Sequence, residues 1–173
     1  MRSLWRRGAS LALSLLLLAG LAGAAAAQQL PALTRPVNDY ANVVDEPSAR
    51  AMTSIIRSLR DASGDTVVVV TVPTFKPYAD IREFAVKLFE NGGKGIGDKG
   101  RDNGLLIVLA VEDHAVRVEV GYDLESIVTD GFAGEVSRQL MVPEFKSGRY
   151  GAGLLVDRKS TRLNSSHVAL SRM

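Results

Sequence analysis

The stretch from Thr66 to Val72 reads TVVVVTV, and the stretch from Gly104 to Ala110 reads GLLIVLA. Both are short, continuous apolar runs, which is typical of strands that are buried on both faces of a sheet. Between them, after a possible N-cap at Asp80, apolar residues recur at helical spacing: Ile81, Phe84, Ala85, Leu88 and Phe89. A strand, a helix and a second strand in this order predict a crossover connection between neighbouring strands of one sheet.

The flanking sequence extends this unit on both sides. Asp45 is a suitable N-cap for a helix that ends at Gly64, and four of that helix's residues give one apolar face: Met52, Ile55, Ile56 and Leu59. The segment from Ala115 to Val120 alternates apolar and charged residues, which indicates an antiparallel hairpin with the preceding strand.

Two more helices are predicted in the last part of the domain. Thr129 caps a helix that starts at Asp130 and that Pro143 should end, and a further helix begins at Tyr150. The order of elements predicts an α/β fold, an α/β/α sandwich with a central mixed β-sheet flanked by helices.

The N-terminal residues 1–27 are typical of a secretory signal peptide. Arginines precede a short apolar run, and a block of alanines with Ala25 and Ala27 offers a cleavage site. The alternative is an uncleaved membrane anchor, but the run is interrupted by Gly20 and Gly23 and is short for a bilayer span of roughly 20 residues. We therefore expect an exported protein of the periplasm, the cell envelope or the secreted fraction.

The C-terminal residues 157–173 match translated DNA of a common short-read sequencing adapter. Residues 157–167 read DRKSTRLNSSH, and the adapter resumes in the same frame as Ser171-Arg172-Met173. The alternative is a natural basic tail, but two matches in one frame leave little room for chance. We expect a single domain at residues 28–156, truncated at its C-terminus, whose lost continuation is a possible membrane tether.

Composition excludes several classes of function. Residues 28–156 carry 14 Lys and Arg against 18 Asp and Glu, a net charge of −4, so the basic surface that binds nucleic acid is missing. The chain has no cysteine, and His114 is the one histidine of this domain, so we expect neither a zinc nor a haem site. A bound metal would have to be a hard cation on oxygen ligands, so Ca²⁺ or Mg²⁺ is the candidate cofactor.

Two features of the sequence resemble functional motifs but do not indicate a nucleotide site or a catalytic base. Residues 95–100 read GIGDKG and fit G-x-G-x-x-G, but a nucleotide site needs a strand before this loop and a helix after it, and here the order is reversed. We expect no nucleotide and interpret the segment as a tightly turned loop. His114 lies in the predicted hairpin turn between acids, where a solvated side chain is a simpler interpretation than a general base.

The acids are the remaining candidates for chemistry. Loops at one edge of the predicted sheet can bring together six oxygen-bearing side chains, Asp39, Asp102, Asn103, Asp123, Glu125 and Asp130. Such a cluster could bind one hard cation. The alternative is that each residue is a helix cap, a turn former or a solvated charge, since the spacing is not that of an EF-hand loop.

Several segments taken in order resemble the TPM domain family. They are VNDYANVV at residues 37–44, the stretch from Phe84 to Gly97, DNGLLI at 102–107, VEVGY at 118–122, residues 124–130, and PEF at 143–145 with Gly148 and Tyr150. The family usually has a glycine where this chain has Asp123, and often a tryptophan where it has Gly92-Gly93.

This resemblance implies an α/β/α sandwich in the cell envelope, and two kinds of function. One is a non-catalytic binding or accessory module for repair or assembly, with an envelope or membrane protein as partner and a divalent cation as a possible ligand. The other is a metal-assisted acid phosphatase acting on phosphomonoesters, with Lys99 or Arg101 countering the phosphate charge. No nucleophile and base stand together in the sequence, so we expect the binding module.

Overall fold

The computed structural model describes residues 30–155. The expected signal peptide at 1–27 and residues 157–173, which we interpreted as translated adapter, lie outside this range. Within it, no helix combines the length and the apolar character needed to cross a bilayer.

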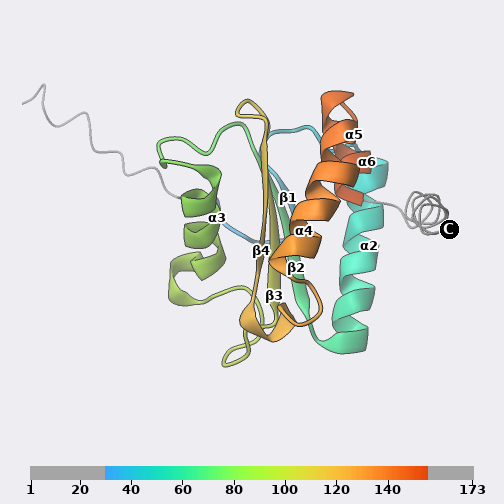
Figure 1. Ribbon diagram of the computed structural model, residues 1–173. Coiled ribbons are helices and arrows are strands. Elements are labelled where there is room, and N and C mark those ends of the chain that lie inside the picture. The colour runs from blue at the N-terminus through green and yellow to red at the C-terminus, as the bar shows by residue number, and fades with distance from the viewer. Residues whose placement is uncertain (1–29, 156–173) are drawn as a thin grey trace, which may run out of the picture.

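A four-stranded mixed sheet forms the centre of the molecule (Figure 1). Its strands stand in sequence order: β1 (Val37–Asp39), β2 (Thr66–Val72), β3 (Gly104–Ala110) and β4 (Ala115–Val120). β1, β2 and β3 are parallel, and β4 returns antiparallel to β3, with Ala115 opposite Ala110 and Val120 opposite Leu105. The predicted hairpin is therefore confirmed.

Helices cover both faces of the sheet, which confirms the predicted α/β/α architecture. One face carries α3 (Ile81–Glu90), and the other carries α2 (Glu46–Ser63) with the C-terminal helices α4 (Asp130–Val136), α5 (Val142–Lys146) and α6 (Tyr150–Leu155) (Figure 1). The connections β1–α2–β2 and β2–α3–β3 step in the same direction across the sheet but lie on opposite faces, so they have opposite hands.

Alternation along β2 explains how one apolar run serves two cores. Val68, Val70 and Val72 pack against Phe84, Ala85 and Leu88 of α3. Val69, on the opposite face, packs with Met52 and Ile56 of α2. Burying a valine contributes roughly 1.5–3 kcal/mol each. The run is apolar throughout because both of its faces are covered.

The helical region at 130–146 differs from the sequence prediction. Pro143 was expected to end the helix that starts at Asp130, but helical structure continues through it to Lys146. A π-helical turn (Ser137–Met141) separates α4 from α5, and Pro143 falls in the first turn of α5. A proline is tolerated there because its missing N–H would lack a helical partner in any case.

The two ends of the parallel strands define two edges of the molecule. We call the edge where β2 and β3 begin, at Thr66 and Gly104, the amino edge. The edge where they end, at Val72 and Ala110, is the carboxyl edge. Because β4 runs the other way, it starts at the carboxyl edge and delivers the chain after Val120 to the amino edge.

Candidate functional site

Asp39 lies at the carboxyl edge, away from the other sequence candidates. It pairs with Thr71 in the register of β1 and β2, whereas Gly104, next to the remaining acids, pairs with Thr66. Five residues of strand at roughly 3.3 Å each place about 17 Å between these levels. Asp39 and Asp102 therefore cannot hold the same ion, and the six predicted residues do not form one site.

The carboxylate of Asp39 instead organises its own turn. Its two oxygens accept hydrogen bonds from the backbone N–H groups of Val43 (3.2 Å) and Val44 (3.0 Å), and the Thr71 hydroxyl donates a further one. These contacts fix the chain between β1 and α2. Its role as a turn former therefore explains the position of this carboxylate without a bound ion.

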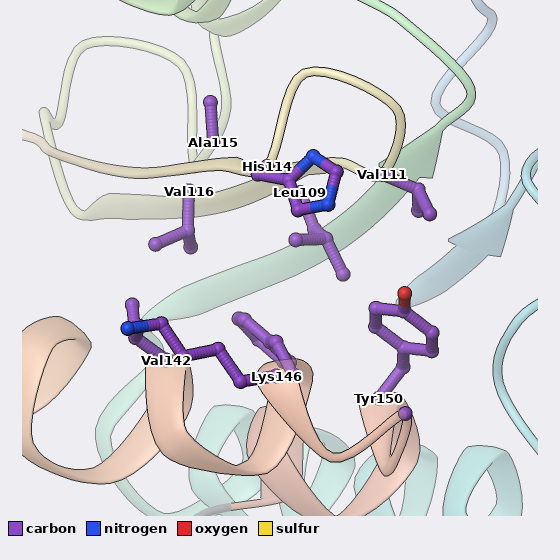
Figure 2. Close-up of a pocket in the computed structure, with 10 residues that line it drawn as sticks. Leu109, Val111, His114, Ala115, Val116, Val142, Lys146 and Tyr150 are labelled. Carbon is purple, nitrogen blue, oxygen red and sulfur yellow. The ribbon is translucent and has the colours of Figure 1, made fainter.

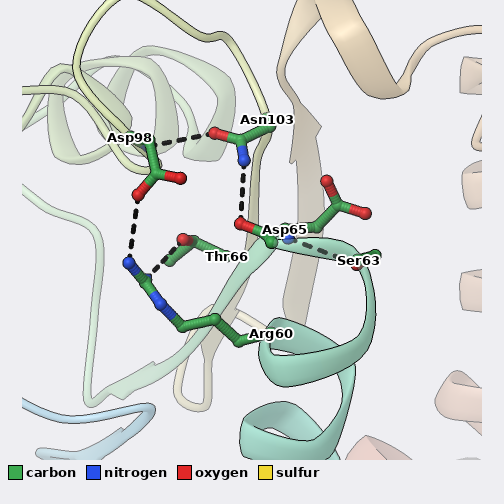
Figure 3. A network of polar contacts seen from close by, with 7 residues as sticks. Arg60, Ser63, Asp65, Thr66, Asp98 and Asn103 are labelled. Carbon is green, nitrogen blue, oxygen red and sulfur yellow. Dashed lines mark hydrogen bonds and ion pairs between the residues drawn. The ribbon is translucent and has the colours of Figure 1, made fainter.

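Asn103 also has a structural role, shown in Figure 3. The side chain is fully buried; its Oδ1 accepts from the N–H of Asp98 (2.9 Å), and its Nδ2 donates to the carbonyl of Gly64 (2.9 Å). Arg60 completes the network by donating to Asp98 (3.0 Å) and to Thr66 (2.7 Å). Asn103 thus joins the end of α2 to the glycine-rich loop before β3, and both ends of its amide have partners within the domain.

Four of the predicted acids remain at or near the amino edge with exposed side chains: Asp102, Asp123, Glu125 and Asp130. Their loops are tied together, because the N–H of Asp123 donates to the carbonyl of Asp102 (3.2 Å) and that of Gly121 to Gly104 (2.8 Å). Asp123 stands in a right-handed 3₁₀ turn, Tyr122–Leu124, so it does not need the left-handed backbone of a glycine.

These acids do not close around a common point. Across residues 30–155, no group of three or more aspartate, glutamate or histidine side chains is placed to hold a metal ion. Asp130 opens α4, directly after the Thr129 hydroxyl that caps the helix by accepting from Phe132 (3.2 Å). A negative charge there is favourable at the positive end of the helix, so the position is explained without a ligand.

The same segment carries a feature that the sequence reasoning missed. Three large apolar side chains are exposed in and just before α4: Tyr122 (76% exposed) and Ile127 (74%) lie between the end of β4 and α4, and Phe132 (55%) lies in the first turn of α4. They stand beside Leu124, which is buried and anchors the segment to the domain. The sequence does contain a signal for this exposure, because these apolar residues do not follow the spacing of a helix face or a strand face.

Charge in this segment is of one sign. Residues 121–137 contain four acids and neither lysine nor arginine. We call residues 121–137 the acidic apolar segment. Exposed aromatic and aliphatic side chains within a field of one sign are characteristic of a surface that meets another molecule.

The glycines that shape this edge permit its close packing. A Cβ at Gly121 would stand 2.1 Å from the carbonyl oxygen of Asp102, and one at Gly104 would stand 1.9 Å from that of Ile96. The glycine-rich loop follows α3 and precedes β3, which is the order that the sequence predicted.

Comparison with known proteins gives a consistent result. The model of the TPM domain matches residues 37–156. No curated protein matched. Among solved structures, the N-terminal domain of a P. gingivalis protein, determined by solution NMR, is 33% identical, with a TM-score of 0.63 over 72% of this chain and 77% of that one.

Two further solved structures share the fold at lower identity. The N-terminal domain of the cg2496 protein from Corynebacterium glutamicum is 15% identical, with a TM-score of 0.53 over 75% of this chain and 79% of that one. The BA42 protein from the psychrophilic bacterium Bizionia argentinensis is 23% identical, with a TM-score of 0.52 over 65% and 74%. Together with the family match across nearly all of the described residues, these findings show that the chain belongs to the TPM domain family.

Proposed function

We propose that this TPM domain is an exported, non-catalytic accessory module that docks a protein partner in the cell envelope through the acidic apolar segment. The observation that carries the proposal is the exposure of Tyr122 and Ile127 on a short connection that Leu124 anchors, and of Phe132 at the start of α4. Aromatic residues are enriched in protein interfaces, where they bury large areas at a small cost in conformational entropy.

The charge of the segment indicates the chemistry of the partner. Four acids without a basic residue favour a partner surface that combines apolar side chains with lysine or arginine. Charges at the rim mainly accelerate association, whereas buried aromatic residues determine how slowly the complex dissociates. Salt should therefore slow association more than it speeds dissociation.

A divalent cation has only an auxiliary role in the proposed docking. A closed oxygen cage does not fit the acids as they are placed, since the described residues offer no convergent group of three. Asp102 and Asp123 nevertheless belong to loops joined by a backbone hydrogen bond of 3.2 Å. Such a pair suits a Ca²⁺ or Mg²⁺ ion that keeps most of its water ligands, bound weakly at the rim of the docking surface.

Site-specific photocrosslinking in a bacterial host that encodes this protein tests the docking proposal. A photoreactive amino acid at Ile127 should give one discrete adduct, and the adduct should weaken when Phe132→Ser is added. The matched control places the same amino acid at Val86, which is 40% exposed on α3 at the opposite face. An equal pattern of adducts at both positions would refute docking through the segment.

Charge reversal provides the second arm of this experiment. Glu125→Lys should slow the formation of the Ile127 adduct without changing the melting temperature, because the side chain is exposed. The same preparation should be assayed with an aryl phosphate at acid pH. Turnover that is lost in Asp123→Asn would replace the binding module with the metal-assisted phosphatase.

A further inference from the structure

A cavity of about 410 Å³ lies at the carboxyl edge, remote from the acidic apolar segment (Figure 2). Its upper wall is the hairpin of β3 and β4, and its lower wall is formed by α5, α6 and the turn between them. A volume in this range suits a small organic molecule.

Most of the lining is apolar. Leu109 and Val116 come from the sheet, and Val142 and Phe145 come from α5. The rings of Phe145 and Tyr150 stack with their centroids 5.9 Å apart and their planes inclined by 25°, which gives the helical wall a flat aromatic surface. Such a surface binds a ring or a short hydrocarbon chain by displacing water.

Three polar groups interrupt this lining from both walls. In Figure 2, His114 stands on the hairpin, the Tyr150 hydroxyl is directed from the helical wall toward the hairpin, and Lys146 runs along the helical wall toward Val142. Within residues 30–155, the Lys146 ammonium has no carboxylate partner and the Tyr150 hydroxyl has no hydrogen bond. Both are therefore available to a ligand.

The surrounding charges leave Lys146 uncompensated. The nearest acid in sequence, Glu144, accepts two hydrogen bonds from Arg149, at 2.6 and 3.1 Å, and this contact lowers the pKa of Glu144. The Asp113 carboxylate, in the hairpin turn, accepts from the N–H of Phe75 (2.9 Å) on the other side of the turn. Glu144 thus has Arg149 as its counter-ion, and the Asp113 carboxylate, which keeps its charge, is held by a backbone N–H outside the cavity lining.

His114 offers one nitrogen to the cavity. Its Nδ1 lies 3.0 Å from the carbonyl oxygen of Glu112, and because a carbonyl only accepts, Nδ1 must carry the proton. Nε2 is left free, as an acceptor in the neutral ring and as a donor in the imidazolium. The backbone of His114 has a φ of 52°, a conformation rare for residues other than glycine, and the turn holds the ring at the mouth of the cavity.

We propose that this cavity binds a small amphipathic anion, an organic carboxylate or sulfonate. Its apolar body lies against Val116, Val142 and Phe145, and its acidic group meets the ammonium of Lys146. The Tyr150 hydroxyl and the Nε2 of His114 lie at the other side of the cavity, where they can bind a second polar group of the ligand. The site is distinct from the docking surface and stands whether or not a partner binds there.

A pair of fluorescent probes tests the charge requirement. The anion 8-anilinonaphthalene-1-sulfonate should bind the folded protein with saturable fluorescence, and the uncharged N-phenyl-1-naphthylamine should bind more weakly. Lys146→Met keeps the length of the side chain but removes its charge, and it should weaken the sulfonate about fivefold while leaving the neutral probe unchanged. Lys94→Met, at an exposed position in the glycine-rich loop, is the matched control and should change neither.

A second variant tests the location. Val116→Phe introduces a larger apolar side chain into the lining and should weaken both probes by about tenfold or more, provided that the variant still melts cooperatively. Displacement of the sulfonate by 2-naphthoate should follow the same order among the variants. The proposal is overturned if the sulfonate does not bind, or if it binds Lys146→Met and Val116→Phe as tightly as the wild type.

Discussion

Replacing Asn103 by alanine tests how the amino edge is held together. The substitution removes the acceptor for the N–H of Asp98 and the donor for the carbonyl of Gly64, both at 2.9 Å. Asn103 itself is fully buried, so its removal also leaves a void beneath the loop. No neighbouring side chain is positioned to replace both bonds at once.

The expected loss of stability depends on how well water can solvate the two backbone groups that lose their hydrogen-bond partner. A buried polar group left without its partner costs about 1–3 kcal/mol. Because Asp98 and Gly64 are partly exposed, water can reach them, and the lower end of that range, about 1–1.5 kcal/mol, applies to each. We therefore expect Asn103→Ala to lower the free energy of unfolding by about 2–3 kcal/mol.

The matched control is Asp98→Ala in the same network. It removes the ion pair with Arg60, in which the Asp98 side chain is 42% exposed and the Arg60 side chain 52%. It keeps the backbone N–H of residue 98, which donates to Asn103. An exposed pair of this kind contributes about 0–1 kcal/mol. The two substitutions should thus differ clearly although they disturb the same loop.

Urea unfolding followed by far-UV circular dichroism measures both variants. With a urea dependence of about 2 kcal/mol per molar, Asn103→Ala should lower the midpoint by roughly 1–1.5 M. A loss below about 1 kcal/mol, or one equal to that of Asp98→Ala, would refute the structural role. If Asn103 were instead a cation ligand, Ca²⁺ would raise the midpoint of the wild type and leave that of the variant unchanged.

Three further predictions use other parts of the molecule. Gly121→Ala should lower the melting temperature strongly, because its Cβ would meet a backbone carbonyl at 2.1 Å, whereas Gly131→Ala in α4, with its nearest atom at 3.9 Å, should raise it slightly. The hydrogen bond from the Phe75 N–H lowers the pKa of Asp113 below its usual 3.8. Its stabilising effect is complete above that value and is lost as the pH falls through the lower folded-state pKa, so Asp113→Asn should flatten the acid limb of a stability profile. In calorimetric titration, any heat of Ca²⁺ binding should vanish in Asp123→Asn and persist in Asp39→Asn, and the reverse result would contradict the assignment of edges.

The main helices and strands can be predicted from local sequence patterns, because the spacing of apolar residues and the capping residues determine where each element lies. The β-branched run of β2, the helical face of α3 and the alternation of β4 each specify one element. Pro143 misled the prediction, since a proline ends a helix only when it falls beyond the first turn. A π-helical turn just before it starts a new first turn, and nothing in the local sequence signals that register.

The candidate site was less predictable because it depends on which edge each loop reaches. Asp39 is the last residue of a strand of only three residues, Val37–Asp39, which resembles a turn when considered alone. Recognised as a parallel strand, it would have placed Asp39 at the carboxyl edge and apart from Asp102. The exposure of Tyr122 and Ile127 depends on how the segment after β4 packs, which spacing does not determine.

β4 connects the two proposed sites, since its first two residues line the cavity and Tyr122 lies two residues after its last. Coupling between them would require an element with two arrangements. β4 offers none, because it pairs with β3 at every residue from Ala115 to Val120 and carries an ion pair of 2.7 Å between Arg117 and Glu119. The helical route from α4 to α5 does contain an irregular π-helical turn, so any coupling would have to pass there.

We therefore expect the cavity and the docking surface to act independently. Ile127→Ser, which removes an exposed apolar side chain from the docking surface, should leave the affinity for the anionic naphthalene probe within about twofold of the wild type. A change of fivefold or more, about 1 kcal/mol, would show that the helices α4 and α5 shift as a unit. Hydrogen exchange of the amides at Ser137–Met141 would then respond to the probe, whereas independent sites predict that the exchange of this turn stays unchanged.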